Sequence, residues 1–335
     1  MRWLRIGRMV VVVCFALIVT ALGGMLLFGT AGAPPVAPGF GNQFRSVDYS
    51  DLPPLEYYRA RDGVSLAFRS YPATATDVRR RRIAVLIHGA SDSSAGMHVV
   101  AKALAATGVS CYVPDLRGHG ANQPHGDIRY SGQLDDDLID FIRLINPKHS
   151  PAQWTLIGFS SGGGFALRID GGAEGNMFDQ YLLLAPGLRY DAPTSRMAAT
   201  NGTGGNDSAS RFVAPNTGRL IAITVLHGLG IRWFDGLPVL AFAVPPDSKR
   251  FTTAYSMRLL ENFSPHQDYL ADIRNIHKPT AVLVGTNDEF LLAEKFAPVF
   301  HGQRTDVEVT VLPGLNHLDL VTSPEAMRAI TAALH

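Results

Sequence analysis

One serine in the chain lies in a setting that could make it a nucleophile. The residues Gly158–Gly162 read Gly-Phe-Ser-Ser-Gly, follow an apolar stretch at Thr155–Gly158 and precede a helical pattern. In a sharp turn from strand to helix, the middle serine projects its hydroxyl, and glycines two residues away on either side let neighbouring backbone approach without a Cβ clash. Ser161 has no glycine two residues before it. The spacing therefore favours Ser160 as the nucleophile.

A serine hydroxyl needs a base to take its proton and a carboxylate to orient that base. Asp288 and His317 each follow an apolar β-branched run and lie in a loop that contains glycine. Taken alone, either residue is better explained as a turn, surface or core residue. The order Ser, Asp, His is one in which triads occur, so we expect Ser160, Asp288 and His317 to form one. Asp319 is a rival acid, but it lies only two residues from His317 and is badly placed to orient that ring.

Attack on a carbonyl also needs two backbone N–H groups aimed at the oxygen that becomes negative. One is expected from Ser161, the residue after the nucleophile. The other is expected from the turn His88-Gly89-Ala90-Ser91 after an early strand, with Ala90 as the donor. A second His-Gly pair, His227-Gly228, lies in a later segment and is interpreted as lid structure.

Short apolar runs alternate with amphipathic stretches from about Leu55 onward, which predicts an α/β fold with a mostly parallel sheet and helices on both faces. Strands are predicted at Ser65–Tyr71, Ile83–His88, Val109–Val113, Thr155–Gly158, Tyr181–Ala185, Thr280–Gly285 and Val307–Leu312. Helices are predicted at Ala95–Thr107, around Leu134–Ile145 and at Pro324–His335. The acidic residues of the second helix, Asp135, Asp136, Asp137 and Asp140, are interpreted as a solvated face rather than a metal site.

The segment from about residue 188 to 262 breaks this alternation. It contains a loop rich in Gly, Asn and Ser at Asn201–Ser210 and an apolar stretch at Leu220–Val244. We expect a cap or lid over the carboxyl ends of the strands, where ligands of open α/β sheets bind. Trp233 and Phe234 are predicted to line an apolar pocket beneath it. The alternative is a helical pair that only packs on the core.

The N-terminus predicts where the chain is located. Arg2, Arg5 and Arg8 precede the uncharged run Met9–Phe28, which as a helix would span roughly 30 Å of hydrocarbon. Residues 1–33 are predicted to be a signal anchor or, if cleavage follows Ala33, a signal peptide; length favours the anchor. Residues 34–54 are expected to be a tether. The arginines hold the N-terminus in the cytoplasm, so the catalytic domain is expected outside it, membrane-anchored or, after cleavage, secreted or periplasmic.

Composition excludes several other classes of protein. The 335 residues are 46% hydrophobic and 18% charged, enough for a sizeable core, and their net charge is +1. The densest basic cluster, Arg79–Arg82, is too short to follow a nucleic-acid backbone, so no nucleic-acid partner is expected. Of the two cysteines, Cys14 lies in the apolar run, which leaves the folded region without an internal disulfide or a thiolate metal site. Neither a metal nor an organic cofactor is expected.

From about Leu55 to its C-terminus, the chain resembles α/β-hydrolases of the lysophospholipase and monoacylglycerol lipase-like branch, which also includes serine aminopeptidase-like enzymes. His88–Ser91 resembles the oxyanion motif, and Asp115–Gly120 is similar to the turn D-x-R-G-H-G, in which the family gives His119 a structural role. Gly158–Gly163 resembles G-H-S-M-G-G, with Phe159 in place of His and Ser161 in place of Met. The resemblance covers residues 55–335 apart from the insertion.

The resemblance implies a serine hydrolase that cleaves carboxylic esters, lipid-like or otherwise apolar in the acyl group, through an acyl-enzyme intermediate. The alternative is a serine aminopeptidase-like peptidase or amidase, which would need acidic residues near the pocket to hold a free amine. The insertion offers few such residues, among them Asp207, Asp235, Asp247 and Glu261. A non-catalytic, membrane-tethered binding protein is the third possibility. The expected partners are a small-molecule ester and a membrane contacted through residues 9–28, with the oligomeric state left open.

Overall fold

The structure of the protein is a computed structural model that describes residues 2–29, 32, 34, 46–74, 81–146, 151–199, 212–245 and 250–334. Several features expected from the sequence lie outside these ranges. They are most of the tether, the cleavage position after Ala33, the loop Asn201–Ser210, the carboxylates of Asp207 and Asp247, and the first two arginines of Arg79–Arg82.

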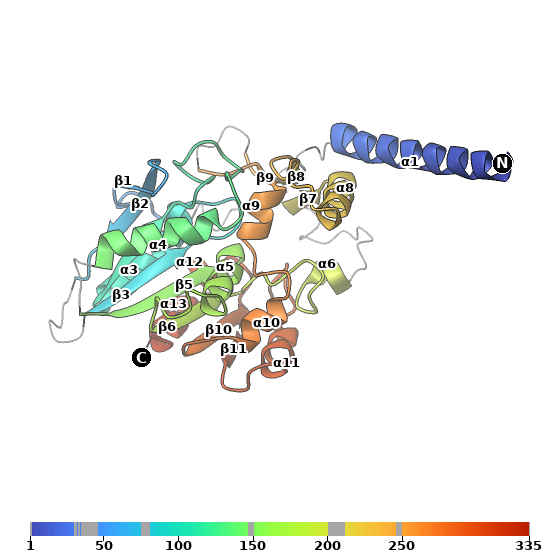
Figure 1. The fold of residues 1–335 in the computed structure, drawn as a ribbon. Coiled ribbons are helices and arrows are strands. Elements are labelled where there is room, and N and C mark those ends of the chain that lie inside the picture. Colours follow the sequence, from blue (N-terminus) through green and yellow to red (C-terminus); the bar gives the residue numbers. More distant parts are fainter. Residues whose placement is uncertain are drawn as a thin grey trace.

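Eight strands form one sheet in the order β1-β2-β4-β3-β5-β6-β10-β11 (Figure 1). β2 is antiparallel to β1 and β4, and every other neighbouring pair is parallel. The predicted α/β class with a mostly parallel sheet is therefore confirmed. The strands are β1 (Glu56–Arg59), β2 (Ser65–Tyr71), β3 (Arg82–Ile87), β4 (Val109–Pro114), β5 (Gln153–Phe159), β6 (Gln180–Leu184), β10 (Thr280–Gly285) and β11 (Glu308–Leu312).

Helices cover both faces of this sheet. The connection from β3 to β4 and the connection from β4 to β5 run in opposite directions across the sheet, so right-handed crossovers place their helices on opposite faces. α3 packs with α12 and α13, and α4 is joined to α5 by an ion pair between Arg168 and Asp135. The helices of the domain are α3 (His98–Ala106), α4 (Gln133–Ile145), α5 (Ser161–Asp170), α10 (Tyr269–Arg274), α11 (Phe296–His301), α12 (Asp319–Thr322) and α13 (Pro324–Ala332).

The predicted strands agree with the observed ones to within two residues at each end. The predicted helix Ala95–Thr107 is a 3-10 turn at Ser94–Met97 followed by α3, and a second 3-10 turn occupies Ala293–Lys295. β1 was not predicted, because only Tyr58 of its four side chains is buried and the strand has no apolar run.

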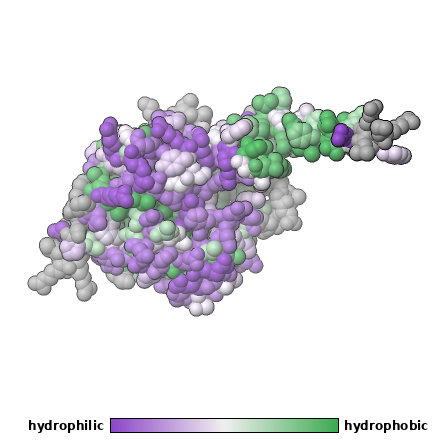
Figure 2. Space-filling model, viewed as in Figure 1, coloured by the Kyte–Doolittle hydropathy of each residue, from purple (hydrophilic) through white to green (hydrophobic). Residues whose placement is uncertain are grey.

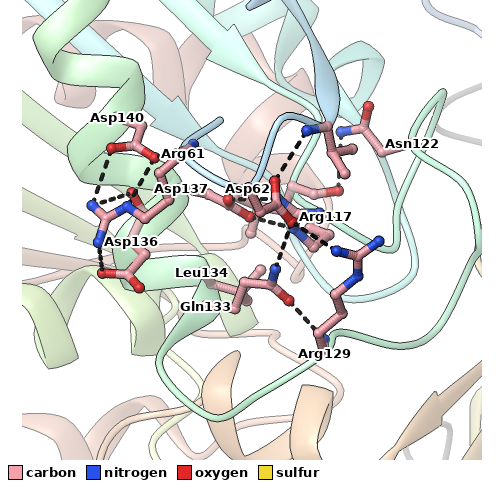
Figure 3. Close-up of polar contacts among 12 residues, drawn as sticks. Arg61, Asp62, Arg117, Asn122, Arg129, Gln133, Leu134, Asp136, Asp137 and Asp140 are labelled. Atoms are coloured by element: carbon pink, nitrogen blue, oxygen red, sulfur yellow. Dashed lines mark hydrogen bonds and ion pairs between the residues drawn. The ribbon is translucent and has the colours of Figure 1, made fainter. Parts of the chain in front are cut away.

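The acidic residues of α4 are paired with arginines, which corrects their interpretation as a solvated face. Arg117 donates hydrogen bonds of 2.8 Å from Nε and Nη2 to the two oxygens of Asp137, which is buried (Figure 3). Arg61 binds both oxygens of Asp140 in the same way, and its Nη1 donates to one oxygen of Asp136. Arg117 belongs to the turn Asp115–Gly120, so its ion pair fastens that turn to α4. A buried carboxylate needs such a partner, and the sequence pattern alone did not identify one.

The segment of residues 188–262, here called the cap, contains a small antiparallel sheet that the sequence did not predict. Its strands are only three to five residues long, too short to show an alternating pattern. The side chain of Asn216 accepts a hydrogen bond from Arg219 N and so caps the N-terminus of the cap's longest helix. The elements of the cap are α6 (Arg196–Ala199), β7 (Val213–Pro215), α8 (Thr217–Gly228), β8 (Pro238–Phe242), β9 (Ala254–Ser256) and α9 (Met257–Asn262).

The N-terminal helix α1 (Arg2–Phe28) projects from the body of the molecule (Figure 1). Its stretch Ile6–Phe28 is long and apolar enough to cross a membrane, and few of its side chains are buried. The end of α1 contacts α8 of the cap. A helix of this composition suits either a membrane anchor or a signal sequence.

Candidate active site

Ser160 lies in the sharp turn between β5 and α5. Its backbone has φ 54° and ψ −118°, a strained conformation for a residue that is not glycine. A Cβ atom on Gly158 would overlap the backbone of Gly162, and one on Gly162 would overlap the backbone of His88. The two glycines of the motif are thus required by close backbone packing, as the sequence predicted.

The structure brings Ser160, His317 and Asp288 together in one line of hydrogen bonds. His317 Nε2 lies 2.9 Å from Ser160 Oγ, and His317 Nδ1 lies 2.7 Å from Asp288 Oδ2. Each residue follows the carboxyl end of a parallel strand, β5, β11 and β10 respectively. The parallel strands end at the same edge of the sheet, so residues far apart in the sequence meet there.

Asp288 is completely buried and held in one orientation. Its Oδ1 accepts hydrogen bonds of 2.9 Å from the backbone N–H groups of Phe290 and Leu291, which leaves Oδ2 to face His317. Because Asp288 Oδ2 accepts from His317 Nδ1, the proton of the neutral ring lies on Nδ1. Nε2 is then free to accept the proton of Ser160.

The electrostatic surroundings of His317 favour its protonated form. Burial is the largest single influence and lowers its pKa, but the charge and hydrogen bond of Asp288, together with the charge of Glu289, outweigh burial. The net result is a pKa raised above the ordinary value of histidine. Glu289 also accepts a hydrogen bond of 3.0 Å from the backbone N–H of His317, which fixes the loop that carries the ring.

Ala90 and Ser161, the expected oxyanion donors, both border the same cavity as Ser160. Ser161 is the first residue of α5, and the first N–H groups of a helix have no partner within it. His88 Nε2 accepts from Leu116 N at 3.2 Å, so its Nδ1 carries the hydrogen that bonds Gly89 O at 2.8 Å. Gly89 O and the Ala90 N–H belong to the same peptide group, and in a trans peptide the carbonyl and the N–H point in opposite directions. Because Gly89 O faces His88, the Ala90 N–H points away from His88.

The turn that carries Ala90 is also bound to the cap, through residues that sequence reasoning missed. Thr252 N donates a hydrogen bond to Ser91 O at 2.7 Å, and Ser91 Oγ donates one to Thr252 O at 2.6 Å. The Ser91 N–H donates to the hydroxyl oxygen of Tyr255 at 2.6 Å, and that hydroxyl lies 2.6 Å from His119 Nε2. His119 therefore positions Tyr255, in line with its expected structural role. Sequence separations of more than a hundred residues gave no signal for these contacts.

A cavity of about 250 Å³ opens above Ser160 and His317. Apolar side chains of the cap form much of its wall: Phe212, Val213, Leu240, Phe242 and Val244. The prediction that Trp233 and Phe234 line the pocket differs from this geometry. Trp233 is 88% exposed, and Phe234 packs within the cap against the cluster of α8. Both follow α8, whereas those five cap residues of the wall lie on the cap's small sheet or next to its strands.

Comparison with known proteins agrees with this architecture. Residues 84–330 match the model of the Alpha/beta hydrolase family. A soluble variant of monoglyceride lipase from Saccharomyces cerevisiae, solved with a substrate analog, is 17% identical and has a TM-score of 0.62, with 84% of this chain and 92% of that chain covered. No curated protein sequence matches the chain.

Two further solved structures share the fold. A monoacylglycerol lipase from Paleococcus ferrophilus is 18% identical with a TM-score of 0.57, and the match covers 80% of this chain and 98% of that chain. A membrane phospholipase A, described as a bacterial virulence factor, is 17% identical with a TM-score of 0.58, and the match covers 98% of each chain. At such identities the likeness concerns the fold, while the family match spans most of the domain. The chain belongs to the Alpha/beta hydrolase family.

Proposed function

We propose that the protein is a serine hydrolase that cleaves carboxylic esters with apolar acyl groups. The observation that carries this proposal is the line of hydrogen bonds from Ser160 through His317 to Asp288, located at the base of an apolar cavity. Family membership supports a hydrolase, and the lipase structures of the same fold support ester hydrolysis at the level of the family.

In the proposed reaction, Ser160 Oγ attacks the ester carbonyl while His317 Nε2 takes its proton. The N–H groups of Ala90 and Ser161 hold the negative oxygen of the tetrahedral intermediate. His317 then gives the proton to the leaving alcohol, and an acyl group remains on Ser160. Water, deprotonated by His317, attacks this acyl-enzyme and releases the acid. Asp288 keeps the ring in the required tautomer and stabilises its positive charge during each step.

The cavity favours an ester over a peptide with a free amino terminus. Among the described residues that border it, the one acidic side chain is that of Asp92. Arg250 donates to both of its oxygens, at 2.6 Å from Nε and 2.9 Å from Nη2, so this charge is already balanced. Asp235 and Glu261 pair with His227 away from the cavity wall. Asp92, the cavity carboxylate that a peptidase would need to hold an amine, is therefore already paired with Arg250.

We also propose that α1 is an uncleaved anchor that holds the catalytic domain outside the cytoplasm. The helix continues unbroken to Phe28, and its last turns pack on the cap rather than ending in a free segment. Three arginines precede the apolar run, and no charged residue follows it until Arg45, which favours a cytoplasmic N-terminus.

Enlarging a cavity side chain should shorten the preferred acyl chain. Val213→Phe fills part of the wall, and each methylene that it excludes loses about 0.8 kcal/mol of burial, about fourfold in kcat/KM. The measurement is kcat/KM for p-nitrophenyl esters of increasing chain length, with aminoacyl anilides in the same panel. Trp233→Ala is the control, because this side chain lies outside the cavity and its loss should leave the profile unchanged. A flat profile in the unaltered protein, or faster cleavage of anilides than of esters, would contradict the proposed substrate class.

The pH dependence should report the raised pKa of His317. The ring must be neutral to accept the Ser160 proton, so kcat/KM rises with pH through this pKa and levels off above it. The rise should be centred above about pH 6.5, the ordinary value for histidine. In Glu289→Gln the amide oxygen can still accept from His317 N, but one negative charge is lost, so the rise should move to lower pH. Profiles of kcat/KM between about pH 5 and 9 test this, and a shift to higher pH would contradict the assignment.

A further inference from the structure

The cap presents a row of large apolar side chains to the outside. Ile221, Val225, Leu229 and Trp233 are spaced four residues apart and are 49%, 45%, 69% and 88% exposed. Residues four apart share one side of a helix, so Ile221 and Val225 lie on one side of α8. Leu229 directly follows the helix, and Trp233 lies in the turn after it. The opposite side of α8, with Ala222, Ile223 and Leu226, is buried in the cap. We call the exposed row the α8 face.

The helix α8, whose outer side carries the α8 face, packs beside the end of α1. Leu22 and Leu26 of α1 pack in the same apolar cluster as the buried side of α8, and Arg219 Nε on α8 donates a 2.9 Å hydrogen bond to Leu26 O. The apolar surface of α1 continues onto the body of the molecule where the helix meets it (Figure 2). In Figure 1, α8 lies next to the C-terminal end of α1.

The length of α1 fixes the depth at which α8 must lie if α1 crosses a bilayer. Its apolar stretch Ile6–Phe28 is about 35 Å long at 1.5 Å per residue, slightly more than the roughly 30 Å of hydrocarbon in a bilayer. Leu22 lies six residues before the end of this stretch, which is roughly 9 Å along the helix. A helix packed against Leu22 and Leu26 is therefore located at the boundary between hydrocarbon and headgroups.

We propose that the α8 face is embedded in the interfacial layer of the membrane that α1 crosses, so that the cap itself contacts lipid. Aliphatic side chains with a tryptophan at the end are typical of helices that lie in this layer, because the indole ring suits the region between headgroups and acyl chains. Exposed to water, the same four side chains would be an unpaired apolar patch next to another apolar surface. In the proposed placement, the bilayer covers both the α8 face and the apolar surface of α1.

The cap connects the cavity with the apolar cluster at the end of α1. Leu240 borders the cavity and also packs against the cluster that holds Leu22 and Leu26. Leu260 does the same, so two cap side chains connect the membrane-facing cluster with the wall of the cavity. This step rests on the proposed function: an apolar ester would be taken up by a cap that already lies on lipid.

Nitroxide labels on the full-length chain in vesicles of phosphatidylcholine and phosphatidylglycerol test the proposal without using activity. The background is Cys14→Ser; Cys111 is buried, and burial raises the pKa of its thiol, so it should not react. Val225→Cys, Leu229→Cys and Trp233→Cys place labels on the α8 face. Tyr57→Cys and Leu144→Cys place matched labels on apolar side chains exposed elsewhere, and Val12→Cys is the reference within α1.

Electron paramagnetic resonance then compares collisions of each label with oxygen, which concentrates in lipid, and with a water-soluble nickel complex. Labels on the α8 face should collide several-fold more with oxygen than with nickel, as at position 12, and the labels at 57 and 144 should do the reverse. Nickel access at all three α8 positions would overturn the proposal. Line broadening that disappears on dilution with unlabelled protein would overturn it in favour of a second copy of the chain. A water-exposed label at position 12 would show that α1 is not in the bilayer, and the proposal would fall with it.

Discussion

Replacing Ser160 with alanine is expected to lower kcat for ester hydrolysis by roughly 10⁴-fold or more. The change removes the one oxygen that lies 2.9 Å from His317 Nε2 and leaves the backbone of the turn in place. The residue already has a positive φ with a Cβ atom, so alanine adds no new strain. The measurement is single-turnover and steady-state hydrolysis of a p-nitrophenyl ester, with circular dichroism and thermal unfolding to show that the fold is retained.

Ser161→Ala is the matched control for this prediction. It removes a hydroxyl one residue away, but the backbone N–H that we assign to the oxyanion hole remains. We expect a loss far smaller than that of Ser160→Ala. Equal losses in two folded proteins would show that the nucleophile is wrongly assigned.

Asp288→Asn should cost almost as much, roughly 10⁴-fold in kcat, through the tautomer of His317. The backbone N–H groups of Phe290 and Leu291 both need an acceptor, so the amide oxygen of the new side chain would face them. Its NH₂ group would then face His317 Nδ1, which must accept rather than donate. The ring hydrogen moves to Nε2, where it blocks transfer of the Ser160 proton.

Asp319→Asn is the control for this substitution, since Asp319 is the other acid near His317 in the sequence. Its carboxylate accepts from Asn316 N at 2.9 Å within the same turn and makes no hydrogen bond to the His317 ring. We expect activity within about tenfold of the unaltered protein, as for loss of one local hydrogen bond. Loss of activity in Asp319→Asn together with retention in Asp288→Asn would reverse the assignment of the acid.

The parts of the fold that could be predicted are those with strong local patterns. β3 and β10 are buried on both faces, so each is a continuous apolar run with clear ends. Ser160 and Asp288 each follow such a run, whereas His317 follows β11, an edge strand with a weaker apolar pattern. The parallel sheet brings the carboxyl ends of these three strands together. Their proximity thus follows from the topology, although none of the three is near another in sequence.

The parts that could not be predicted depend on contacts between distant segments. The hydrogen bonds of Ser91 with Thr252 and Tyr255 join an early turn to the cap, and nothing in the local sequence around either partner indicates them. The sequence predicts that Trp233 lines the pocket because its stretch holds too many apolar residues for a solvated loop. Trp233 is exposed instead, and several cap residues of the cavity wall lie on the cap's small sheet, whose strands are too short to give a pattern.

The central claim is that Ser160 is an activated nucleophile, and a fluorophosphonate tests it most directly. Attack of Ser160 Oγ on phosphorus expels fluoride and leaves a stable phosphonyl-serine, which mass spectrometry locates by peptide. We expect a single adduct on Ser160 in the full-length protein, none in Ser160→Ala, and much slower formation in Asp288→Asn. A folded protein that forms no adduct, or one that reacts at another residue with Ser160 unmodified, would contradict the account.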